Sequence, residues 1–106
     1  GAGWQLAFAP RPSPLPVGRH FALDIVLCAP AGHALPATLA VDADMPAHRH
    51  GMNYRATVKA LGDGRSGEAR YAAEGLMFHM PGRWDLTFDI VTGRGTERLT
   101  GTMLIE

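Results

Sequence analysis

Apolar and polar side chains alternate with a period of two along most of this chain. The alternation is clearest over residues 83–91 (RWDLTFDIV), where apolar side chains occupy every second position. This pattern is typical of a half-buried β-strand, and no helical periodicity of useful length is visible. Glycine and proline interrupt the pattern at short intervals. Strands are therefore predicted over residues 1–9, 19–28, 38–43, 54–61, 68–73 (running on toward residue 78), 83–91 and 98–105.

These short strands predict the fold class. Seven of them in a chain of 106 residues indicate an all-β protein, an immunoglobulin-like antiparallel β-sandwich, with a small β-barrel as the alternative. The length allows one domain, spanning residues 1–106. Proline occupies every second position from Pro10 to Pro16, and proline cannot donate a ladder hydrogen bond. We therefore expect residues 10–18 to form an extended connection at a sheet edge.

Composition narrows the range of partners. Ten basic and ten acidic residues balance, so the formal net charge is zero. A balanced chain lacks the basic face that nucleic acid requires, and it has no strong attraction to an anionic membrane surface. The single cysteine, Cys28, excludes an intramolecular disulfide. No apolar run is long enough to cross a bilayer, although a removed leader or a membrane anchor is compatible with this sequence.

The candidate chemistry is concentrated in residues 44–54 (DMPAHRHGMNY). His48 and His50 are two positions apart, so in an extended segment their imidazoles point to the same side. Met52 continues that parity, and Met45 joins if the turn after it folds back. A second segment, FHMPG, contains His79 and Met80 side by side. An extended backbone would direct these two side chains to opposite faces, so a turn is needed for both to reach one site.

Imidazole and thioether groups together favour copper. Imidazole binds copper, zinc and nickel, whereas thioether is a soft ligand that selects Cu(I). Zinc sites more often include thiolate or carboxylate, and the spacing here matches no zinc or calcium motif. The structural alternative is that these histidines are solvated turn residues and that the methionines only pack. His20 and His33 lie outside the cluster and are interpreted as structural or solvent-facing. We find no catalytic set and expect no enzymatic activity.

Three stretches resemble a known family. MPAHRHGM (45–52), GDG (62–64) and EGLMFHMPGRWDL (74–86) are similar to the YtkA-like (FixH-related) domain, and the resemblance extends over residues 21–105. It implies an immunoglobulin-like sandwich that is exported or membrane-anchored and faces the periplasm or the cell exterior. It also implies a role in copper handling, in some members during respiratory oxidase assembly. Carried over by position, the metal ligands would be His48, His50, Met52 and His79, with Met45 and Met80 as second choices.

The resulting hypothesis is a periplasmic copper-binding protein, specifically a Cu(I) carrier that exchanges its ion with a donor or acceptor protein. Cu(II) is the second choice of ion. The alternative is a protein–protein interaction module without a metal, associated with a membrane or oxidase assembly system. A site shared between the two chains of a homodimer is a further alternative, since one surface offers few ligands.

Overall fold

The described part of the chain consists of strands and the turns between them. The computed structural model describes residues 3–33, 38–47, 50–52, 54–63 and 67–105, and for His50 and Asp63 it describes the backbone only. No helix occurs in these ranges, and so none that could cross a membrane. The strands are β1 (Gln5–Arg11), β2 (His20–Cys28), β3 (Thr38–Met45), β4 (His50–Gly51), β5 (Thr57–Asp63), β6 (Glu68–Met77), β7 (Gly82–Thr92) and β8 (Gly95–Ile105).

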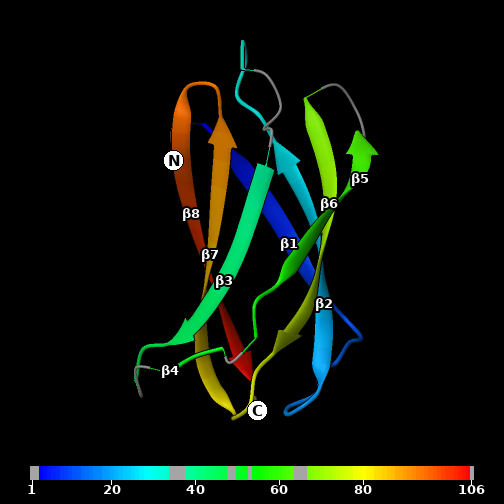
Figure 1. Cartoon of the computed structure of the whole chain (residues 1–106), viewed down its shortest axis with the longest axis vertical. Coiled ribbons are helices and arrows are strands. Elements are labelled where there is room, and N and C mark those ends of the chain that lie inside the picture. The colour runs from blue at the N-terminus through cyan, green and yellow to red at the C-terminus, as the bar shows by residue number, and fades with distance from the viewer. Residues whose placement is uncertain (1–2, 34–37, 48–49, 53, 64–66, 106) are drawn as a thin grey trace.

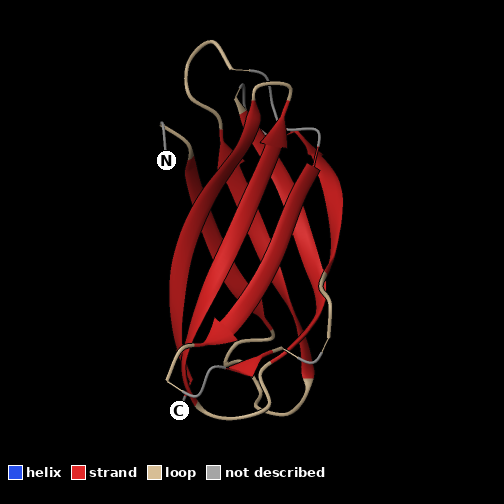
Figure 2. Cartoon of the chain, turned by 60° about the vertical axis from the view of Figure 1, so that its left-hand side comes forward, coloured by secondary structure: helices blue, strands red, loops and turns tan. Residues whose placement is uncertain are grey.

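The strands form two four-stranded antiparallel sheets, in the orders β1-β2-β6-β5 and β4-β3-β7-β8. The two sheets pack face to face, and the turns gather at the two ends of an elongated body (Figure 2). Seven strands in this order, with β4 added beside β3, reproduce the two-sheet arrangement of immunoglobulin domains. The prediction of an immunoglobulin-like β-sandwich is confirmed.

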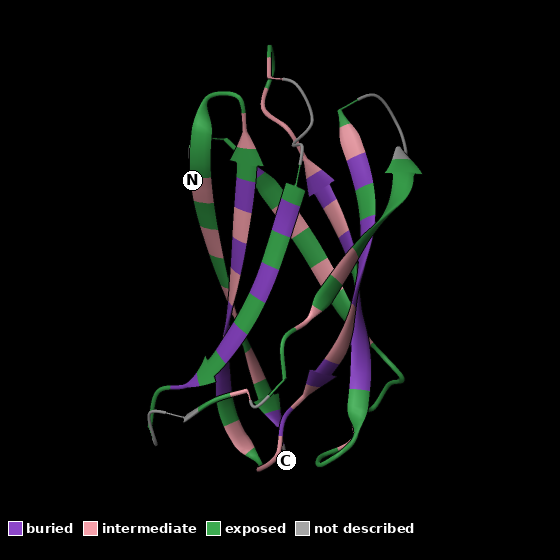
Figure 3. Ribbon diagram, viewed as in Figure 1, coloured by how far each residue is buried: buried purple, intermediate pink, exposed green. Residues whose placement is uncertain are grey.

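Alternating burial explains why these segments form strands. In β3 every second side chain from Leu39 to Met45 is buried, and those between them are exposed (Figure 3). The same alternation in β7 places Trp84 and Phe88 in the core. Phe78 stacks on Trp84, with ring centroids 4.5 Å apart and planes 9° apart. Burial of these large rings between the sheets supplies much of the apolar area that holds the sandwich together.

The structure differs from the predicted strand limits at several ends: β1 begins at Gln5 rather than at residue 1, β3 continues to Met45, and β8 begins at Gly95 rather than at residue 98. Pro10 and Arg11 belong to β1, so the proline-rich connection starts later than residue 10. Proline is tolerated at this position because β1 is the edge strand of its sheet, and one side of an edge strand forms no hydrogen bonds to a neighbouring strand. The strand predicted over residues 54–61 begins at Thr57 instead. The two-residue strand β4 was not predicted, because it is too short to show alternation.

The two ends of the sandwich carry different side chains. At the lower end in Figure 1, β3 turns into β4 and β6 leads into β7. There the backbone N–H of Gly18 donates to the carbonyl of Phe78, at 2.9 Å. At the opposite end, the ring of His33 lies edge-on to Trp4, and an N–H of Arg94 lies 3.0 Å from His33 Nε2. His33 is therefore far from both histidine- and methionine-containing segments.

Candidate metal centre

The first segment is a tight return at the end of β3. The chain turns after Met45, and β4 comes back antiparallel, so that His50 pairs with Met45 and Gly51 pairs with Asp44. The backbone N–H of Met52 donates to the carbonyl of Ala43, at 3.4 Å. The return directs Met52 toward the core, against which its half-buried side chain packs. His48 and the side chain of His50 lie outside the described residues, so their predicted convergence stays a prediction.

The second segment is held by the core ring of Trp84. The indole N–H of Trp84 donates to the backbone carbonyl of Met80, at 3.0 Å. His79 is half-buried, and its ring lies edge-on to the same indole, with centroids 5.4 Å apart. One buried tryptophan therefore fixes both candidate ligands of this segment. Met80 packs its side chain against the core rather than extending into solvent.

Met45 and Gly82 join the two segments. Met45 is only 1% exposed and belongs to the hydrophobic core. A Cβ placed on Gly82 would lie 2.8 Å from Met45 Cε, so the methionine methyl fills the space that glycine leaves open. The two sequence motifs are thus in contact, as the metal hypothesis requires. Met45 makes this contact as a packed core side chain, which is a structural role that does not need a metal.

The structure brings all five methionines toward this end of the sandwich. Met77 pairs across the strands with His20, and Met103 pairs with Trp84. Sequence reasoning missed Met77 and Met103 as neighbours of the site, because only the strand register brings them there. We refer to this end as the methionine end, defined by Met45, Met52, Met77, Met80 and Met103.

His20 also lies at the methionine end. It is exposed, which is one of the two roles, structural or solvent-facing, predicted for it, and its Nδ1 lies 3.1 Å from the carbonyl oxygen of Gly75. The ring of Tyr54 lies edge-on to the imidazole, with centroids 4.7 Å apart. The register of β2 against β6 decides this position, and no sequence motif marks it.

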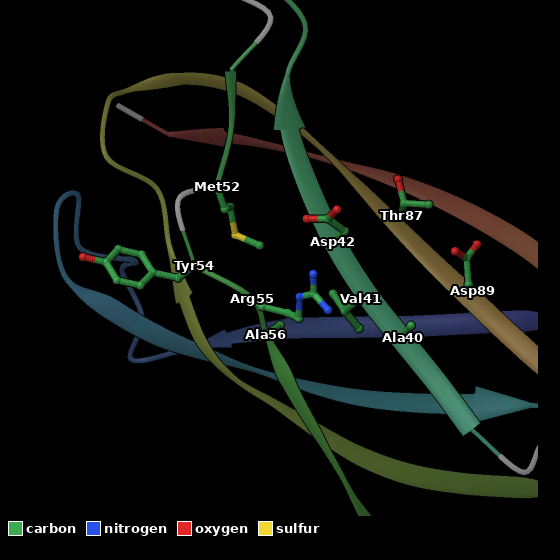
Figure 4. A pocket seen from close by; sticks show the side chains of 9 residues that line it. All are labelled: Ala40, Val41, Asp42, Met52, Tyr54, Arg55, Ala56, Thr87 and Asp89. Atoms are coloured by element: carbon green, nitrogen blue, oxygen red, sulfur yellow. The ribbon is translucent and has the colours of Figure 1, made fainter.

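A groove of about 490 Å³ opens beside Met52 (Figure 4). Met52 and Arg55 border it on one side, and the carboxylates of Asp42 and Asp89 border it on the outer face of the β3–β7 pair. Asp42 accepts the backbone N–H of Ala43, at 2.8 Å. Asp89 accepts hydrogen bonds from Arg98, so both carboxylates already have a donor from the protein.

The ion pair between Arg98 and Asp89 determines the charge state of one groove carboxylate. Hydrogen bonds from Arg98 to both carboxylate oxygens of Asp89, at 2.8 and 3.1 Å, lower the pKa of this carboxyl below its ordinary value. Asp89 is therefore ionised and already paired at neutral pH. Within the described ranges, no three histidine, cysteine or carboxylate side chains come together in a way that could hold a metal ion. A metal at the methionine end would accordingly depend on thioether ligands or on the loop histidines.

Comparison with known proteins adds no relative. No protein-family model matches the chain, and neither a curated protein nor a solved structure matches it significantly. The resemblance to the YtkA-like domain therefore stays a prediction from the motifs.

Proposed function

We propose that this protein binds a copper ion, preferentially Cu(I), at the methionine end and passes it to another protein. The ligands would be drawn from His48, His50, Met52 and His79, with Met80 and Met45 as second choices. Imidazole and thioether groups together suit Cu(I) and give no closed thiolate cage. Such a site permits ligand exchange with a donor or acceptor protein.

The observation that carries this proposal is the contact between the two motifs through Met45 and Gly82. Segments separated by more than twenty residues of sequence meet at one end of the sandwich, and each brings histidine and methionine. His79 is positioned there by Trp84, and Met52 and Met80 pack beside the core. The resemblance to the YtkA-like domain adds to this proposal a carrier role in the periplasm, with a copper-donating or copper-accepting partner.

A Cu(I) titration in competition with a colorimetric chelator tests the proposal. We expect the loop site of the wild-type protein to withdraw one equivalent of Cu(I) from the chelator, counted apart from any ion bound elsewhere. His48→Ala/His50→Ala should lose this binding, and His79→Ala should weaken it by about tenfold or more. His33→Ala is the matched control, because His33 lies at the opposite end and contacts Trp4 and Arg94 instead. Equal binding by the wild type and the double variant would overturn the proposal.

The groove beside Met52 favours a second candidate, a docking module that works without a metal. Its wall combines apolar and charged groups, and Tyr54 at its rim is 48% exposed. Pockets of about this size bind ligands in many proteins, and tyrosine is enriched at protein–protein interfaces. Failure of the wild-type protein to compete for Cu(I) would favour this reading, and the groove would then be the surface to change by mutation.

A further inference from the structure

The hydrogen bond of His20 selects the tautomer of its neutral ring. The partner of Nδ1 is the backbone carbonyl of Gly75, at 3.1 Å, and a carbonyl oxygen can only accept a hydrogen bond. Nδ1 therefore carries the proton, and in the neutral ring Nε2 carries the lone pair. A histidine whose Nδ1–H donates to a backbone carbonyl is the arrangement that orients metal-binding imidazoles.

An irregularity in β6 directs the Gly75 carbonyl to His20. Phe21 pairs with Leu76, and Leu23 pairs with Ala73, so Ala22 alone faces both Glu74 and Gly75. This is a β-bulge, and Gly75 adopts a φ of 80°, which a glycine reaches without strain. Bulges re-aim backbone and side-chain groups locally. The carbonyl contact of His20 is thus a product of the local backbone geometry.

A thioether lies next to this imidazole. His20 and Met77 are direct antiparallel partners, so their side chains lie on the same face of the sheet, with Cβ atoms about 4.5–5.5 Å apart. Met77 is half-buried, and His20 is exposed. The edge-on ring of Tyr54, with its centroid 4.7 Å from that of the imidazole, flanks His20. An imidazole and a thioether therefore extend from paired positions on one face of the sheet, where solvent reaches the imidazole.

We propose that His20 Nε2 and Met77 Sδ form a second site for a soft monovalent metal ion, Cu(I) or Ag(I). Both ions accept low coordination numbers, and an imidazole with a thioether suits them better than it suits zinc. The site uses none of the ligands assigned to the loop site. It would hold a second ion at the methionine end and does not require the proposed carrier function.

A silver titration of protein labelled with ¹³C at the methionine methyl groups tests this site. Silver(I) is diamagnetic and redox-stable, and the His48→Ala/His50→Ala background removes the loop histidines. We expect the Met77 methyl and the His20 ring signals to shift in a saturable manner. His20→Gln, whose amide can still donate to the Gly75 carbonyl, should abolish the Met77 shift. Met77→Leu should likewise abolish the His20 shift.

The controls separate this site from the loop site. His33→Gln, at the opposite end, should leave the Met77 shift unchanged. An unmoved Met77 methyl at saturating silver, or a Met77 shift that survives in His20→Gln, would overturn the proposal. The Met52 methyl, followed in the protein with intact loop histidines, reports on the loop site alone. Thermal unfolding of each variant verifies that the fold is retained.

Discussion

Gly82 leaves open the space that the methyl group of Met45 occupies, since a Cβ on Gly82 would lie 2.8 Å from Met45 Cε. The two residues come from different motifs and from the neighbouring strands β3 and β7. Gly82 also has a φ of 131°, which side-chain-bearing residues rarely adopt. Glycine is therefore required after Pro81 for two separate reasons, the close packing of Met45 and the positive φ.

Replacing that glycine should destabilise the protein. We expect Gly82→Ala to lower the free energy of unfolding by about 2–4 kcal/mol, because the new methyl group overpacks against Met45 and the backbone is strained. Chemical denaturation measures the loss. Gly93→Ala is the matched control, because its Cβ would meet no atom within 4 Å and its φ is not positive. Equal stability of the two variants would show that the Met45 contact is not tight.

Met45→Leu separates packing from metal binding. The exchange conserves volume, so we expect a stability loss of less than about 1.5 kcal/mol. Leucine has no thioether, and Met45 is buried in the core. Copper affinity should therefore stay within about threefold of wild type if His48, His50, Met52 and His79 are the ligands. A large loss of affinity with intact folding would instead make Met45 a ligand.

Trp84→Phe should weaken the second motif without abolishing the fold. The variant loses the indole N–H that binds the Met80 carbonyl, and it leaves a small void beside Phe78. We expect a destabilisation of about 1–3 kcal/mol. Methyl NMR should show the Met80 signal displaced and the Met52 signal nearly unchanged. Unchanged Met80 signals would mean that the turn after His79 does not depend on this hydrogen bond.

Acid should remove two arginine–carboxylate contacts. Hydrogen bonds from Arg11 lower the pKa of Asp24, and hydrogen bonds from Arg98 lower the pKa of Asp89. A lowered folded-state pKa means that the unfolded chain binds protons first as pH falls. The stabilisation is therefore complete above the ordinary carboxyl pKa of about 4, and it is lost as pH falls through the lowered folded-state values.

Thermal unfolding measured from about pH 6 to about pH 2 checks this dependence. Both pairs are solvent-exposed, so the effect should be small. In a plot of Tm against pH, Asp24→Asn/Asp89→Asn should reduce the fall of Tm at acid pH and leave the dependence at higher pH unchanged. Parallel curves for the wild type and the double variant would place the acid sensitivity elsewhere in the chain.

Period-two alternation was sufficient to predict the all-β fold and most strand positions. It worked because each strand buries one face, as β3 shows from Leu39 to Met45. The same alternation over residues 83–91 placed Trp84 on the apolar face of its strand, and the structure buries it in the core. The sequence could not predict β4, whose two residues show no period, or the start of β5 at Thr57.

Only the tertiary structure decided which side chains meet. Strand order and register bring Met45 to Gly82 and His20 to Met77, and both depend on backbone pairing between segments distant in the sequence. A register shift of one residue would reverse the faces of every side chain, and no local pattern encodes the partner strand. The residue types that suggest copper were thus readable in the sequence, whereas their meeting at one end is a consequence of the sandwich topology.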